Sequence, residues 1–195
     1  MSYKLKYTGL QVDDSVGGFH AETLYDDIDF EGITLATGNS APDLINFYGQ
    51  GNIIGRSFDG GSTLEQLYGG GELLHFYKEN GDVSFHVHWM PSTATAGTVK
   101  WFLEYTWYNM ESLPQQPIVN TISVLDQAGG VAWFPRVVAF PDISGQGKKT
   151  GSHFRFRIYR NPSDVQDTYP NDAAFDSAGL HVPVDSNGSR QIFIK

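Results

Sequence analysis

Two histidines separated by one residue are the first feature of this sequence with potential for chemistry. His86 and His88 lie in the segment 83–90, Val-Ser-Phe-His-Val-His-Trp-Met, in which apolar and polar residues alternate. Successive side chains of a β-strand point to opposite faces, so the alternation predicts a half-buried strand with both imidazoles on one face. Two imidazoles at this spacing can share a metal ion, because neutral imidazole is a common ligand of zinc and related metals.

A complete metal site needs more ligands than this pair. Cupin jelly rolls use two histidines in this way together with a glutamate that follows closely, but Met90 to Thr93 contain no carboxylate. Glu104, on the next predicted strand, is the acidic residue expected to face the histidines, and three other histidines are free in principle: His75, His153 and His181. A cupin-like metal enzyme therefore remains the third alternative. The prediction is that the chain binds no metal and no cofactor.

Other catalytic patterns are missing from the sequence. Residues 13–31 hold seven acidic side chains but lack the Asp-x-Asp-x-Asp-Gly spacing of a calcium loop, so a solvated extended arm is expected there. The sequence contains no Gly-x-Ser-x-Gly elbow and no P-loop pattern. It also has no cysteine, which excludes disulfides and a cysteine nucleophile. We predict that the chain is not an enzyme.

The elements that position the histidines are expected to be β-strands. The segment 101–109 places large apolar residues, among them Trp101 and Trp107, on one parity, and 152–160 does the same with Phe154 and Phe156. We expect 83–90 and 101–109 to form a long antiparallel hairpin with an aromatic core face. Glycine-rich turns separate roughly eight to ten strands. The sequence predicts an all-β fold, an antiparallel jelly-roll-like β-sandwich with an extended N-terminal arm.

The chain divides into two parts on this interpretation. Residues 1–70 are expected to form the N-terminal arm and short strands, packed on or continuous with the main domain, and residues 71–195 the β-sandwich. An edge strand is expected at 3–7, and a terminal strand at 190–194 is expected to close the domain. A chain of 195 residues is long enough to bury one core without disulfides.

The polar parity of three predicted strands suggests a binding surface. We expect these strands to share one outer sheet face, with a dense set of donors and acceptors that suits a neighbouring subunit. The candidate subunit-interface residues are His86, His88, Glu104, Arg155, Arg157 and Tyr159. A homotrimer built through this face is the prediction, and an ordinary solvated sheet face is the alternative.

Charge and hydropathy restrict the possible partners. Thirteen basic and 22 acidic residues give a net charge of −9, which opposes attraction to nucleic acid or to an anionic membrane. No apolar run approaches the roughly 20 residues that span a bilayer, and no apolar run of export-signal length follows the amino terminus. We therefore expect a soluble protein that folds in the cytoplasm and binds neither nucleic acid nor membrane.

The part of the chain from Glu72 to Lys195 carries several distinctive short motifs. They are His75-Phe76-Tyr77-Lys78, Gly81, Phe85-His86-Val87-His88-Trp89, Gly97-Thr98-Val99-Lys100-Trp101, Glu104-Tyr105-Thr106-Trp107, Phe154-Arg155-Phe156-Arg157-Ile158-Tyr159-Arg160, Asp167-Thr168-Tyr169, Leu180-His181-Val182 and Asp185-Ser186-Asn187-Gly188-Ser189-Arg190-Gln191. In this order they resemble a family of tailed-bacteriophage virion structural proteins. The resemblance implies a jelly-roll domain on the capsid surface or in a tail fibre, usually trimeric, and it supplies no catalytic residues.

The resemblance leads to a specific expectation for function. A capsid decoration or cement protein that stabilises the phage head by binding neighbouring major capsid proteins is the first hypothesis. The expected location is then the surface of the virion, after folding in the host cytoplasm. The alternative is a tail-fibre or receptor-binding head for host surface glycan, with Tyr108, Trp133 and Tyr169 as the aromatic residues that would stack on sugar rings.

Overall fold

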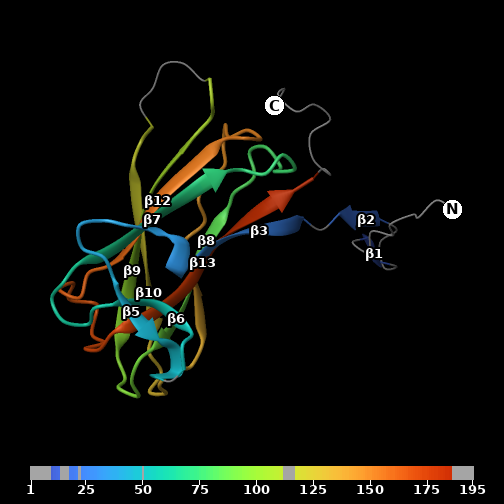
Figure 1. Cartoon of the computed structure of the whole chain (residues 1–195). Helices are drawn as coiled ribbons and strands as arrows, with labels where there is room; N and C mark the ends of the chain where they lie inside the picture. The colour runs from blue at the N-terminus through green and yellow to red at the C-terminus, as the bar shows by residue number, and fades with distance from the viewer. Residues whose placement is uncertain (1–9, 14–17, 22, 50, 112–116, 186–195) are drawn as a thin grey trace.

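The computed structural model describes residues 10–13, 18–21, 23–49, 51–111 and 117–185. Two antiparallel sheets pack face to face as a jelly-roll-like β-sandwich, which confirms the predicted fold class (Figure 1). The only helical segments among the described residues are two single 3₁₀ turns, η1 (Gly32–Thr34) and η2 (Phe47–Gly49). None of the helical segments in these ranges has the length or apolar character needed to cross a membrane. The strands expected at 3–7 and 190–194 lie outside the described residues.

The first sheet has five strands in the order β10-β9-β12-β7-β4. Their bounds are Asn120–Gln127 for β10, Thr98–Tyr108 for β9, His153–Arg160 for β12, Glu65–Glu72 for β7 and Ala36–Thr37 for β4. The predicted boundary between residues 70 and 71 therefore falls inside β7. Strands from residues 1–70 and strands from residues 71–195 belong to the same sheet.

The second sheet is built around one long strand, β13 (Ala173–Val184). The strand order is β11-β8-β13-β6-β5, and β3 pairs with the second half of β13. The bounds are Arg136–Ala139 for β11, Ser84–Pro91 for β8, Ile54–Phe58 for β6, Asp43–Asn46 for β5 and Leu24–Glu31 for β3. A separate hairpin of β1 (Leu10–Asp13) and β2 (Gly18–Ala21) lies beyond the start of β3, to the side of the two sheets (Figure 1).

The space between the sheets is filled by the aromatic residues that the alternation had placed on one parity. Phe85 of β8 is fully buried, and its ring packs against Phe154 and Phe156 of β12 at centroid distances of 6.3 and 4.9 Å. Trp89 and Trp101 meet across the sheets at 6.1 Å. Rings supply large buried areas with specific edge-to-face contacts, so these stripes hold the two sheets together.

The prediction that 83–90 and 101–109 form a hairpin is wrong. β8 pairs with β11 and β13, whereas β9 pairs with β10 and β12, so the two strands lie in different sheets. Both strands carry a stripe of large apolar side chains, and in one sheet these stripes would lie side by side. The link 92–97 instead crosses the roughly 10 Å between the sheets, so that the stripes cover each other.

The acidic segment is also more ordered than expected. Residues 24–31 are strand β3, which pairs with β13 along its whole length instead of forming a solvated arm. The reason lies in the apolar residues between the charges. Phe30 is buried in the core and Ile28 packs against it, while Asp27 and Asp29 take the opposite parity and face outward.

A buried carboxyl at the start of β7 gives the fold a pH dependence. Burial, with a smaller contribution from the charge of Asp59, raises the pKa of Glu65 to about 7. The hydrogen bond that the Asp59 N–H donates to Glu65 Oε2 at 2.6 Å opposes this shift only in part. The folded state therefore holds a proton that the unfolded chain releases above about pH 4.5. Stability contributed by this group declines as the pH rises from 4.5 to 7.

We expect Glu65→Gln to remove this decline, because the amide cannot ionise but can still accept the Asp59 N–H. Relative to the variant, the wild type should lose on the order of 2 kcal/mol of unfolding free energy between pH 4.5 and 8. Urea unfolding at several pH values measures the difference. Parallel stability curves for the two proteins would contradict a raised pKa at this position.

Candidate functional site

Three neighbouring strands bring Asp27, His86 and His181 together on the outer face of the six-stranded sheet. His181 of β13 lies directly opposite Asp27 of β3, and His86 of β8 lies opposite Gly179 of β13. Gly179 has no side chain, which lets the His86 ring lie across β13 toward Asp27. A Cβ at position 179 would come within 2.6 Å of His86 Nε2 and 2.9 Å of Asp27 Oδ1.

The polar atoms of these three residues form a compact set. His181 Nε2 is 3.1 Å from Asp27 Oδ2, and His86 Nε2 is 3.9 Å from the same oxygen. One ligand-type atom from each residue falls within 4.8 Å of the other two. The rings of His86 and His181 are 4.4 Å apart, and that of His88 is 4.9 Å from His86. The arrangement is a cluster of three imidazoles and one carboxylate, which we call the His–Asp cluster: Asp27, His86, His88 and His181.

His86 is the buried member of the His–Asp cluster. It is 3% exposed, and within the described part of the chain its Nδ1 has no hydrogen-bond partner. Burial lowers the pKa of His86; the charge of Asp27 opposes this shift, and the neighbouring His181 and His88 add to it. His86 is therefore a neutral imidazole at pH 7, the form in which a ring nitrogen can accept a proton or bind a metal.

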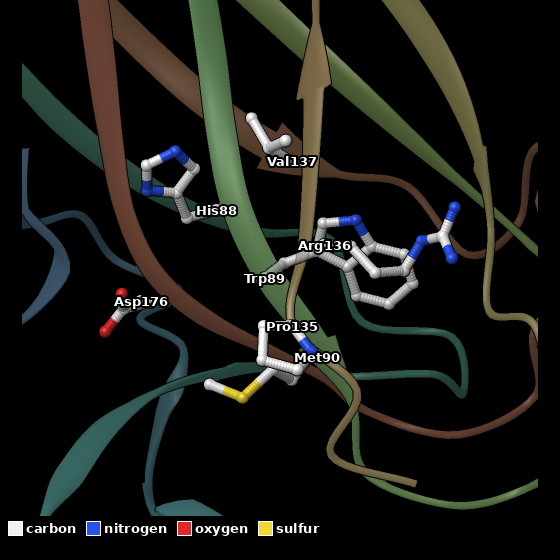
Figure 2. A pocket seen from close by; sticks show the side chains of 7 residues that line it. All are labelled: His88, Trp89, Met90, Pro135, Arg136, Val137 and Asp176. Carbon is white, nitrogen blue, oxygen red and sulfur yellow. The ribbon is translucent and has the colours of Figure 1, made fainter. Parts of the chain in front are cut away.

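A small pocket of about 300 Å³ opens beside the cluster on the same sheet. Figure 2 shows its lining residues: His88, Trp89, Met90, Pro135, Arg136, Val137 and Asp176. The register of β13 shifts between Phe175 and Ser177, so Asp176 is the extra residue of a β-bulge at the pocket. His88 is held by a 3.1 Å hydrogen bond between its Nδ1 and the Ser177 hydroxyl.

Arg136 in this pocket is already paired. Its Nε donates to Asp126 Oδ2 at 2.7 Å and its Nη2 to Asp126 Oδ1 at 2.6 Å, while Trp89 Nε1 donates to the same carboxylate at 2.9 Å. In Figure 2 the Arg136 and Trp89 side chains lie close together on one side of the pocket. The guanidinium is therefore part of a link between the two sheets, through β8, β10 and β11, and its charge is balanced within the chain.

A second, smaller apolar cluster includes Met90, which also lines the pocket. Phe47, Met90 and Ala174 are its buried members, and the partly buried Ile45 and Trp133 pack against them. We call these five residues, together with the exposed Tyr48, the apolar patch. Tyr48, which is 52% exposed, contacts the Trp133 ring at 6.2 Å. Both aromatic residues have a left-handed backbone, with φ of 60° and 59°. That conformation is costly for large side chains and is concentrated at functional sites, so the Tyr48–Trp133 pair is a candidate contact point.

The opposite outer face, on the five-stranded sheet, carries the other predicted residues. Arg157 pairs with Glu104 across β12 and β9, with Nη2 to Oε2 at 2.9 Å, and its guanidinium lies 4.3 Å from the Tyr159 ring centroid. Tyr159 in turn stacks on Phe102 at 4.8 Å. Arg155 is exposed on the same parity of β12. Glu104, Arg155, Arg157 and Tyr159 therefore share one face.

The expectation that all six candidate interface residues share one face is wrong. His86 and His88 lie on the outer face of the six-stranded sheet, and the other four lie on the outer face of the five-stranded sheet, because β8 and β9 belong to different sheets. His86 is in addition buried within the chain. The role of the remaining residues in a subunit interface stays a prediction.

The carboxylate beside the histidines was also misassigned from the sequence. Glu104 binds Arg157 on the far sheet, and Asp27 of β3 takes the place beside His86. The alternation of 24–31 with Asp27 on its outward parity was visible in the sequence, but the pairing of β3 with β13 was not. Of the aromatic residues considered for sugar stacking, Tyr169 is buried, Tyr108 stacks on His153, and Trp133 belongs to the apolar patch.

Comparisons with known proteins give distant structural likenesses. No family model and no curated protein matches the chain. The CBM36-1 domain of a multidomain xylanase from the hindgut metagenome of Trinervitermes trinervoides has a TM-score of 0.43 and 10% identity, covering 84% of this chain and all of that one. CBM35 from Cellvibrio japonicus Abf62 has a TM-score of 0.44 and 7% identity over 83% of this chain and all of its own.

A third similar structure is much longer than this chain. An exo-beta-1,3-galactanase from Phanerochaete chrysosporium has a TM-score of 0.43 and 9% identity, with 88% of this chain covered but 32% of the galactanase. At this distance the three likenesses assign no function to the chain.

Proposed function

We propose that this chain is a structural protein of a tailed-bacteriophage virion, and specifically a capsid decoration or cement protein. The sequence motifs between Glu72 and Lys195 are the first support. The observation that carries the proposal is the apolar patch on the outer face of the six-stranded sheet. Its exposed Tyr48 and its neighbour Trp133 are held in a costly backbone conformation, a cost that a protein keeps where the side chains are needed for contact.

The proposal gives the two outer faces different partners. The apolar patch binds the major capsid protein, because aromatic residues set in an apolar surround are the usual anchors of protein interfaces. The polar face with Glu104, Arg155, Arg157 and Tyr159 binds neighbouring copies in a homotrimer. In a cyclic trimer, one patch on each copy contacts a different patch on the next copy. The paired charges and the stacked rings of this polar face provide two such patches, one polar and one aromatic. The proposed role involves no catalysis.

An add-back experiment with virions tests the proposal. Virions made without this protein should lose heat or osmotic resistance, and purified wild-type protein should bind them and restore it. A Tyr48→Ser, Trp133→Ser double variant should fold but bind at least about tenfold more weakly, since hot-spot aromatics each contribute 2 kcal/mol or more. Val165→Ser, which changes an exposed apolar residue in the segment between β12 and β13, should still bind the particle.

Two results would contradict the proposal. One is a particle whose heat and osmotic resistance does not depend on the protein, and the other is equal binding by the wild type and the double variant. A monomer at all concentrations in sedimentation would contradict the trimer alone.

The same Tyr48–Trp133 pair favours one second candidate, a receptor-binding head that stacks these rings on host glycan. A glycan array separates the two roles. Binding to defined glycans that is lost in the double variant, together with a low copy number at the tail, would support the receptor role instead of the decoration role.

A further inference from the structure

Three residues of the His–Asp cluster have the composition and geometry of a transition-metal site. Asp27, His86 and His181 come from three adjacent strands, β3, β8 and β13, and each presents one ligand atom within 4.8 Å of the other two. In a tetrahedral zinc site with bonds of about 2.0–2.1 Å, ligand atoms stand about 3.3 Å apart. The 3.1 and 3.9 Å separations from Asp27 Oδ2 bracket that value, so small side-chain rotations suffice.

We propose that Asp27, His86 and His181 bind one divalent transition metal ion of the zinc class, which links β3 to β13 and β8 within the six-stranded sheet. Two imidazole nitrogens with one carboxylate oxygen suit zinc, cobalt or iron and disfavour calcium and magnesium, which take oxygen ligands. The side chains of His181 and Asp27 are 50% and 36% exposed, so the outward coordination position is open to water or to a partner's side chain. The site is independent of the apolar patch and of the proposed role in a virion.

The state of His86 is the second observation that points to a ligand. This imidazole is 3% exposed, and its Nδ1 has no hydrogen-bond partner within the described part of the chain. Its other nitrogen, Nε2, faces Asp27 Oδ2 at 3.9 Å, a distance too long for a hydrogen bond. A buried ring nitrogen that lacks a close partner costs free energy, and a metal bound at Nε2 would give that nitrogen a close partner.

Gly179 is the third observation, because it provides the space that the site needs. It lies between His86 and Asp29 in the register of β8, β13 and β3. A methyl group at position 179 would meet the His86 ring at 2.4 Å and Asp27 Oδ1 at 2.9 Å. No positive φ constrains this glycine, so its small size, and not its backbone freedom, is what the neighbouring ligands require.

Binding measurements on tag-free protein test the site. The probe is Zn²⁺, titrated by calorimetry after removal of metal with a chelator, and Co²⁺ for its visible absorption. We expect one equivalent per chain, no competition from Ca²⁺ or Mg²⁺, and nitrogen-ligand absorption from Co²⁺. Loss of a residue that only orients a metal ligand lowers metal affinity by about 10–100-fold. His181 and Asp27 are proposed as ligands themselves, so His181→Gln and Asp27→Asn should each weaken zinc binding at least tenfold. Gly179→Ala should weaken it as well.

His75→Gln is the matched control. His75 belongs to a different group of side chains, where its Nε2 lies 3.4 Å from Glu72 Oε1, so this variant removes a histidine without touching the site. His75→Gln should keep wild-type affinity and stoichiometry. Circular dichroism of each metal-free variant checks the fold, since Asp27 and His181 are at the surface and tolerate a polar replacement.

Hydrogen exchange gives a readout that a structural role alone would not move. Zn²⁺ should slow amide exchange in residues 24–31 of the wild type and leave it unchanged in His181→Gln, because a ligand that binds only the folded strand protects it. Three results would overturn the proposal: no zinc binding by the wild type, undiminished binding by both His181→Gln and Asp27→Asn, or equal loss of binding in His75→Gln.

Discussion

Arg160→Ala is expected to lower the free energy of unfolding by about 3–5 kcal/mol, the usual cost of removing one partner of a buried ion pair. The side chains of Arg160 and Asp167 are 0% and 1% exposed. Arg160 Nε donates to Asp167 Oδ2 at 2.9 Å and Nη2 to Oδ1 at 2.8 Å. Removal of the guanidinium leaves the Asp167 carboxylate buried with its main counter-charge gone.

The guanidinium also satisfies backbone carbonyls that have little other access to donors. Arg160 donates to the carbonyl oxygen of Asn171 at 2.8 Å, to that of Phe58 at 3.3 Å and to that of Tyr169. It therefore joins the end of β12 to β6 of the other sheet and to the segment before β13. A large loss is expected because one substitution breaks all of these contacts at once.

Thermal and urea unfolding measure this effect. With roughly 2–4 °C of melting temperature per kcal/mol for a domain of this size, Arg160→Ala should melt about 10 °C lower. Arg155→Ala, an exposed arginine on the same strand, is the control and should change stability by less than about 0.5 kcal/mol. A loss below about 1 kcal/mol in Arg160→Ala would contradict the assigned role.

Phe85→Ala is the second substitution expected to have a large effect, at about 3–5 kcal/mol. Phe85 is fully buried between the sheets, where its ring contacts four others: Phe30, Phe140, Phe154 and Phe156. These rings come from several strands and both sheets, so the space cannot close by movement of a single side chain. The loss includes both the transfer free energy of the ring and the cavity that remains.

Phe102→Ala is the matched control for Phe85→Ala. Phe102 is the same residue type, but it lies on the outward parity of β9, stacked on Tyr159 at 4.8 Å. Its removal should cost about 1 kcal/mol, because solvent fills the space and only one ring pair is lost. Equal losses for the two substitutions, measured by urea unfolding, would show that the sheets are not held together by the buried rings.

The inward and outward parity of the strands was predictable from the sequence, because it depends only on alternation. Phe85, Trp101 and Phe154 are buried as expected, and His88 and Arg155 face outward. The assignment of strands to sheets was not predictable in the same way. Two consecutive strands that each carry an apolar stripe can form a hairpin within one sheet or lie in two facing sheets. The alternation pattern is the same in both cases, and only the other pairing partners of the two strands distinguish them.

The candidate site illustrates the same limit. His86 and His181 were visible as histidines on strands, and Asp27 as one of seven acidic residues, but they are far apart in sequence and meet only through β13. Arg160 was missed for a different reason. It falls on the apolar parity of β12, but a charged residue is not expected in the core. The sequence does not show that Asp167 and three backbone carbonyls lie close enough to accept its hydrogen bonds there. Contacts between distant segments decide both cases, and local pattern does not contain them.

The central position of β13 has a consequence for how the molecule is made. This strand pairs with β3, β6 and β8, which all precede it in the sequence. These three strands therefore leave the ribosome before their common partner is available. Contacts between such distant segments make folding slow, and unpaired strand edges remain open to association while synthesis continues. A newly made chain should therefore stay sensitive to protease until β13 has emerged, and chaperones that shield β3 and β8 during translation should raise the yield of native protein.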